Sequence, residues 1–235
     1  VILEDIRAAF PEYQVCRAWT SKMIIRKLAK RDGLIIPTVS EAMEALMKEG
    51  VEEVIIQPTH IINGIENDQM TLDVKAYAEH FRKITFRTPL LTTTEDNEKA
   101  LHAVMAEIPL AEDEGLVFMG HGSHHSANNV YAVLDHMLKD LGYPRAMMGT
   151  VEAYPGMEEL ICQAKELGVK KILLAPFMMG AGDHAKNDMA GEEEDSWKNR
   201  FEKEGFQVRC ILRGLGEYAA IRQIFVDHAK AAMEA

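Results

Sequence analysis

The sequence has few cysteines and no long apolar run. Its 235 residues include three cysteines, Cys16, Cys162 and Cys210, which stand far apart and form no C-x-x-C pair. This pattern excludes a thiolate zinc site and a disulfide framework, and it favours a reducing compartment. We therefore expect three free thiols, buried as small apolar residues. No stretch approaches about 18 consecutive apolar residues, so no membrane-spanning helix is expected.

Basic residues are in the minority. The chain has 26 Lys and Arg against 37 Asp and Glu, a net charge of −11. This balance argues against nucleic acid as a partner, because phosphate binding needs a basic surface. We expect a cytoplasmic protein. A periplasmic location stays open if a signal peptide precedes the given chain.

Several catalytic motifs are also missing. There is no G-x-x-x-x-G-K-[ST], hence no P-loop for ATP, and no G-x-G-x-x-G opening a helix after a strand. Neither H-E-x-x-H nor G-x-S-x-G occurs. The chemistry is therefore sought in the histidine loops considered below.

Helical and strand patterns alternate along the chain, and 47% of the residues are apolar. Strands separated by helices of 10–15 residues predict an α/β fold with parallel pairing. The expected strands are 13–18, 51–57, 83–87, 116–119, 146–151, 169–175 and 206–212. The expected helices are 3–10, 21–31 with Ser21 as the cap, 38–49, 67–82, 94–108, 127–141, 157–167, 196–205 and 217–233.

A repeat suggests that the chain was duplicated. Residues 50–58, GVEEVIIQP, match residues 168–176, GVKKILLAP, at an offset of 118. Two ordinary buried parallel strands would also look alike, but we favour two similar α/β halves that face each other. The halves are expected at 1–90, completed by the C-terminal helix 217–235, and at 91–216. Subtracting 118 from Leu116 gives a position just before Val1, so we expect one more strand and glycine loop upstream.

Two histidine loops follow apolar strands in the second half. One is Gly-His-Gly around His121, and the other runs from Phe177 to His184. Parallel strands end at one edge of their sheet, so the two histidines should lie together there, with Glu152 at the end of a third strand. Imidazole and carboxylate bind Co²⁺, Ni²⁺, Fe²⁺ and Zn²⁺. The sequence therefore predicts a metal site formed by His121, Glu152 and His184.

The remaining histidines carry less weight. His60 stands in the corresponding loop of the first half, and facing the cleft or making ordinary hydrogen bonds are equally open for it. The others are expected to make ordinary hydrogen bonds: His80, His102, His124, His125, His136 and His228.

Longer motifs identify a family. Residues 119–125 (MGHGSHH), 151–155 (VEAYP), 181–189 (AGDHAKNDM), 20–28 (TSKMIIRKL) and 60–64 (HIING) resemble the anaerobic sirohydrochlorin cobaltochelatases, in the same order along essentially the whole chain. The resemblance implies an ATP-independent class II chelatase of two similar α/β halves with a cleft between them. The family's first strand, which ends in a Ser-Phe-Gly-Thr type loop, has no counterpart here.

The resemblance also implies roles for residues. His121 and His184 match the family's metal-binding histidines, with Glu152 as their carboxylate. His121 would also be the base that accepts pyrrole protons. Substrate carboxylates would meet the glycine loop of Gly180 and Gly182 and cations such as Arg26, with His60 also assigned to substrate binding.

We therefore expect an enzyme that inserts Co²⁺ into sirohydrochlorin or precorrin-2 for anaerobic cobalamin synthesis. Its partners would be the macrocycle and a divalent metal, with no cofactor beyond the substrate Co²⁺ and no ATP. The sequence leaves open a homo-oligomer. It also leaves open an iron or nickel chelatase on the same macrocycle, and a tetrapyrrole or metal carrier without turnover.

Overall fold

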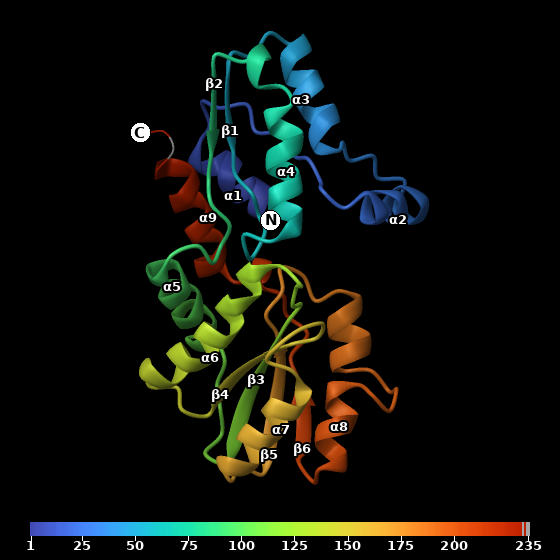
Figure 1. Cartoon of the computed structure of the whole chain (residues 1–235), viewed down its shortest axis with the longest axis vertical. Coiled ribbons are helices and arrows are strands. Elements are labelled where there is room, and N and C mark those ends of the chain that lie inside the picture. Colours follow the sequence, from blue (N-terminus) through green and yellow to red (C-terminus); the bar gives the residue numbers. More distant parts are fainter. Residues whose placement is uncertain (232, 234–235) are drawn as a thin grey trace. The chain divides into compact units, whose positions relative to one another are not determined.

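The computed structural model describes residues 1–231 and 233. The chain divides into two compact units. Unit 1 contains Val1–Pro89 and the C-terminal segment Gln223–Ala235, and unit 2 contains Leu90–Arg222. Figure 1 labels their elements. Residues 232, 234 and 235 of the predicted C-terminal segment lie outside the described residues.

Unit 2 is built on a parallel sheet of four strands: β3 (Glu114–Gly120), β4 (Ala146–Thr150), β5 (Lys171–Pro176) and β6 (Gln207–Cys210). Their order is β4-β3-β5-β6, and every neighbouring pair is parallel. All seven residues of β3 are buried. A strand with neighbours on both sides and covered on both faces is typically apolar, and every residue of β3 after Glu114 is apolar. The predicted α/β fold with parallel pairing is confirmed.

Helices flank this sheet (Figure 1). They are α5 (Thr94–Met105), α6 (Asn129–Asp140), α7 (Met157–Glu166) and α8 (Trp197–Lys203), with short helical turns at Ser126–Asn128 and Leu215–Glu217. Helix α9 (Ala219–Ala231) begins in unit 2 and ends in unit 1. One core cluster joins Val117 of β3 and Leu174 of β5 to Leu160 of α7 and Phe201 of α8. Burying such side chains contributes about 1.5–3 kcal/mol each. The core thus fixes where each strand ends.

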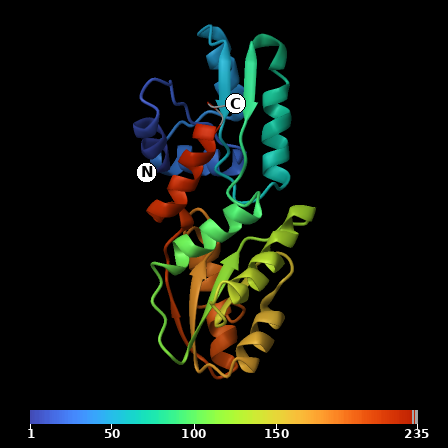
Figure 2. The same cartoon turned by 90° about the vertical axis from the view of Figure 1, so that its left-hand side faces the viewer.

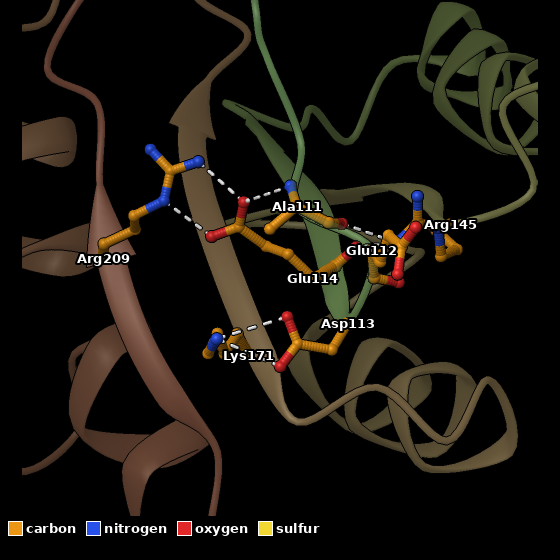
Figure 3. Close-up of polar contacts among 7 residues, drawn as sticks. All are labelled: Ala111, Glu112, Asp113, Glu114, Arg145, Lys171 and Arg209. Atoms are coloured by element: carbon orange, nitrogen blue, oxygen red, sulfur yellow. Dashed lines mark hydrogen bonds and ion pairs between the residues drawn. The ribbon is translucent and has the colours of Figure 1, made fainter.

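A buried carboxylate ties the far end of the sheet together (Figure 3). Glu114 opens β3, and its side chain is only 3% exposed. Arg209 of β6 donates to both of its carboxylate oxygens, at 2.6 and 2.7 Å. These bonds reach across the intervening β5, because β3 and β6 are not neighbours. The Arg209 guanidinium holds the pKa of the Glu114 carboxyl below its usual value.

Unit 1 contains a parallel pair of strands, β1 (Glu53–Ile56) and β2 (Lys83–Phe86). Its helices are α1 (Ile2–Ala9), α2 (Lys22–Asp32), α3 (Val39–Lys48), α4 (Ile65–Lys75) and the short η1 (Ala78–His80). The Ser21 hydroxyl accepts from the backbone N–H of Ile24, which confirms the expected cap of α2. The end of α9, red in Figure 2, belongs to this unit, where Arg87 donates to the backbone carbonyl of His228 at 2.6 Å.

The repeated segments have similar neighbours. In unit 1, Glu53 of the first copy pairs with Lys83 of the next strand along the chain. In unit 2, Lys171 of the second copy pairs with Gln207, again of the next strand along the chain. Both pairings are parallel. The likeness thus includes parallel pairing with the next strand along the chain as well as composition, although β5 also pairs with β3 on its other side.

Three expectations are wrong. Residues 13–18 form no strand, and near them the described chain has only an isolated bridge between Trp19 and Thr38. A strand needs a partner for its backbone groups, and the described sheet of unit 1 consists of β1 and β2 alone. The helix predicted at 67–82 starts earlier, at Ile65, and ends at Lys75, before η1.

The third concerns the thiols. Cys16 and Cys162 are exposed, and Cys210 is half-buried, although all three are free as expected. Cys162 lies on α7 away from its buried positions, and Cys16 lies in the segment that forms no strand.

None of the helices in the described part of the chain has the length and apolar character that a membrane span requires.

Candidate metal centre

The ladder between β3 and β4 continues into the loops that carry two of the predicted ligands. Val151 N–H donates to the Gly120 carbonyl, and Glu152 N–H donates to the His121 carbonyl, each at 3.0 Å. His121 and Glu152 therefore leave the sheet side by side. Their position follows from the register of two buried strands.

His184 comes from the neighbouring strand on the other side of β3. After β5 the chain passes through Gly180 and Gly182 and then forms a single π-helical segment, η3 (His184–Met189). Its wider turn is seen in the bond from Ala190 N–H to the Ala185 carbonyl, at 3.2 Å and five residues back. Ala185 and Met189 are buried and fix the segment to the core. π-Helical turns are rare in proteins, and those that occur are often found at functional sites.

The three side chains converge. One potential ligand atom from each of His121, Glu152 and His184 lies within 4.8 Å of the other two. The two imidazole rings stand at 85° with their centroids 4.6 Å apart. Side-chain exposures are 48% for His121, 49% for Glu152 and 35% for His184, so a ligand can reach the group from solvent.

Hydrogen bonds indicate which ring nitrogens can bind a metal. His121 Nδ1 lies 2.9 Å from the Gly122 carbonyl, and His184 Nδ1 lies 2.5 Å from Asp188 Oδ2. Since both partners accept, each Nδ1 carries the hydrogen, which leaves each Nε2 with a lone pair. Glu152 Oε2 stands 3.7 Å from His121 Nδ1, outside hydrogen-bonding distance. The arrangement offers two imidazoles and a carboxylate to one divalent ion.

The predicted substrate-binding residues fall in different parts of the chain. Gly180 and Gly182 lie in the loop before η3 and are exposed, and a Cβ atom on either would meet no atom within 4 Å. Arg26 is exposed on α2 of unit 1. His60 belongs to unit 1, where its ring nitrogens lie 3.4 Å from Thr20 Oγ1 and from Asn67 Oδ1. Burial lowers the pKa of His60, so its neutral form is favoured.

Sequence reasoning gave Asp188 no role. The structure shows it bonded to a proposed ligand, one helical turn after His184. Its spacing of four residues was the available signal, because residues i and i+4 are neighbours on a helix. That signal was hidden because a loop was expected there.

A family model described as cobalt chelatase (CbiK) matches residues 1–234. The chain belongs to the cobalt chelatase family. This result confirms the resemblance seen in the motifs. The family assignment covers both units, and the three converging side chains lie in unit 2.

Relatives within and around the cobalt chelatase family agree. The chain is 42% identical over 230 residues to the sirohydrochlorin cobaltochelatase of Salmonella typhimurium, covering 97% of this chain and 87% of that one. It is 33% identical over 240 residues to the sirohydrochlorin cobaltochelatase CbiKC of Nitratidesulfovibrio vulgaris, covering 99% and 83%. The structure of SirB from Bacillus subtilis with Fe³⁺ matches with a TM-score of 0.63 at 14% identity, over 98% of this chain and 86% of that one, and so supports the fold alone.

Proposed function

We propose that this protein inserts Co²⁺ into sirohydrochlorin without ATP, in anaerobic cobalamin synthesis. The observation that carries the proposal is the convergence of His121, Glu152 and His184 at the carboxyl edge of one sheet. Membership of the cobalt chelatase family and the names of two relatives above 30% identity support it. The unpaired cysteines fit a cytoplasmic enzyme.

Insertion exchanges two protons for one metal ion. The macrocycle loses two pyrrole N–H protons, and four ring nitrogens take up Co²⁺ with their lone pairs. Three protein ligands would hold the incoming ion and leave its remaining positions open to the macrocycle. The exposure of all three side chains leaves room for that approach.

His121 would also serve as the base. Once the ion passes to the macrocycle, Nε2 of His121 regains its lone pair and can accept one of the two pyrrole protons, while the other passes to the solvent that reaches the site. Glu152 lies 3.7 Å from the other nitrogen of that ring and would stabilise the imidazolium that forms. One pair of residues would thus deliver the metal and remove a proton.

The acidic macrocycle would be recognised outside the metal site. Arg26 can pair with a substrate carboxylate, and the exposed backbone around Gly180 and Gly182 can donate N–H groups to others. His60 would contribute from unit 1. Gly180→Ala adds a methyl group that meets nothing in the protein, so a raised KM for the macrocycle with an unchanged melting temperature would report a substrate contact.

The test is His184→Ala. Anaerobic insertion of Co²⁺, followed by the absorption of the macrocycle, should fall by more than about 100-fold because a ligand is lost. His136→Ala is the matched control, since His136 is exposed on α6. A His184→Ala variant that inserts cobalt at the wild-type rate would refute the assignment.

Two further functions are separated by simple assays. Imidazole and carboxylate also suit Fe²⁺ and Ni²⁺, so insertion rates with the three metals side by side would reveal an iron or nickel chelatase. A carrier would bind sirohydrochlorin tightly and show no spectral change on addition of Co²⁺.

A further inference from the structure

The two histidines of the metal centre have different partners. Nδ1 of His121 donates to a neutral backbone carbonyl, that of Gly122. Nδ1 of His184 donates to the carboxylate of Asp188 over 2.5 Å. A hydrogen bond to a charged acceptor is roughly twice as strong as one to a neutral acceptor. The protein therefore holds one ligand more firmly than the other.

We propose that Asp188 is a positioning residue that holds His184 in its metal-binding tautomer and makes it the anchoring ligand. The proposal rests on the function proposed above. An imidazole bonded to carboxylate through Nδ1–H keeps its Nε2 lone pair pointed at the metal and is a better donor. His121, held only by a carbonyl, would be the ligand that lets the ion go.

The π-helical segment brings the two residues together. Asp188 follows His184 by four residues within η3, where Lys186, Asn187 and Asp188 are exposed between the buried Ala185 and Met189. Ala185 and Met189 are fully buried, whereas the side chains of His184 and Asp188 are 35% and 47% exposed. The segment is thus anchored to the core by these two apolar residues. Removing the carboxylate should affect the ligand and not the fold.

The chain contains its own control. His136 and Asp140 on α6 have the same order and spacing, with Nε2 3.4 Å from the carboxylate. Both are far more exposed, at 79% and 68%, and α6 contributes no side chain to the metal centre. Asp140→Asn therefore removes the same charge at the same spacing from a histidine without touching a proposed ligand.

The experiment compares Asp188→Ala, Asp188→Asn, Asp188→Glu and Asp140→Asn in the full chain. Binding of Co²⁺ alone, followed by its visible absorption, should weaken about 10- to 100-fold in Asp188→Ala. Asp188→Asn, which retains a neutral acceptor, should lose less, and Asp188→Glu should recover part of the affinity. Insertion should fall at low Co²⁺ and return toward the wild-type rate at high Co²⁺.

A readout without metal tests the tautomer. Nitrogen NMR of the ring should show His184 protonated on Nδ1 in the wild type and shifted toward Nε2 in Asp188→Ala. The proposal is overturned if Asp188→Ala keeps the wild-type tautomer and cobalt affinity. If Asp188→Ala has a lowered melting temperature, the tautomer and the cobalt affinity are measured instead in the nearly isosteric Asp188→Asn. Wild-type cobalt affinity in His184→Ala would instead refute the metal centre itself, so the two failures are distinguishable.

Discussion

A Cβ atom on Gly122 would lie 2.9 Å from the backbone nitrogen of Ala153. It would also stand 3.1 Å from the backbone nitrogen of Glu152. The loops that carry His121 and Glu152 therefore pack so closely at Gly122 that no side chain fits between them. Real Cβ atoms do not approach backbone so closely, and the backbone of Gly122 also has a positive φ of +85°. Only glycine lets the loop after β3 pack against the loop after β4.

Gly122→Ala should therefore damage the metal centre. We expect a loss of about 1–3 kcal/mol in the free energy of unfolding from the backbone strain, and a further loss from the collision. Cobalt affinity should fall because Glu152 moves away from His121. Denaturant unfolding and a Co²⁺ titration measure the two effects.

Gly142→Ala is the control for that variant. Gly142 follows α6 with nearly the same φ, +86°, but a Cβ there meets nothing within 4 Å. It should show the strain cost alone and keep the wild-type cobalt affinity. Equal effects of the two variants on cobalt binding would show that contact between the loops is unimportant.

Gly191 closes the π-helical segment. A Cβ on this residue would lie 2.2 Å from the Asn187 carbonyl oxygen, the same oxygen that accepts the Gly191 N–H at 3.0 Å. Gly191→Ala should force the turn to open and displace His184, with cobalt affinity falling more than about tenfold. Gly205→Ala, after α8, is the comparison: its Cβ meets no atom within 4 Å, and its φ of +90° adds a strain cost that should leave cobalt affinity unchanged. Unchanged ring NMR signals of His184 in Gly191→Ala would contradict this expectation.

The Glu114–Arg209 pair should be the more stabilising of the two ion pairs at the start of β3 (Figure 3). Arg209→Met leaves a buried carboxylate without its main partner and should cost about 2 kcal/mol at neutral pH. Lys171→Met breaks the ion pair with Asp113. Both side chains of this pair are exposed, so the loss should cost under about 1 kcal/mol. Chemical denaturation of both variants gives the comparison.

The pH dependence of that cost has a definite sign. Arg209 lowers the pKa of Glu114 in the folded protein, so the pair stabilises above the unfolded pKa, about pH 4.5. The contribution is lost as the pH falls through the folded value. The stability difference between wild type and Arg209→Met should therefore shrink in acid, and a difference that grows there would contradict the assignment.

His60 should make unit 1 sensitive to mild acid. Burial lowers its pKa in the folded state, so the unfolded chain binds a proton first as the pH falls below about 6.5. Stability contributed by the neutral ring is present above that pH and declines below it, through the folded pKa. Wild type should lose stability relative to His60→Gln as the pH falls below about 6.5. His80→Gln, at an exposed position on η1, should track the wild type.

Much of the fold could be predicted from the pattern of residues. The alternation of apolar runs with amphipathic segments predicted the parallel sheet of unit 2. A short apolar run such as that of β3 is typical of a strand buried on both faces of a parallel sheet. The expectation that His121, Glu152 and His184 would lie close together followed from one rule, that parallel strands end at one edge. The structure does bring them within 4.8 Å.

Other features depend on information that a local pattern does not hold. Residues 13–18 have a strand composition, but pairing depends on neighbours elsewhere in the chain. Glu114 precedes the apolar run of β3, and its partner Arg209 is 95 residues away. The π-helical segment η3 is a single turn of six residues, too short to leave a trace in hydrophobic periodicity.

Each candidate ligand stands on a segment of its own: His121 and Glu152 on the loops after β3 and β4, and His184 on η3 after β5, while the strands are packed together in the core. The side chains that would bind the metal can therefore be changed independently of the strands that support them. A change such as Glu152→His would alter the charge and hardness of the ligand set without disturbing the register of the sheet. Such an architecture lets metal preference drift by single substitutions, and it makes the same frame a ready starting point for engineering chelatases toward other ions.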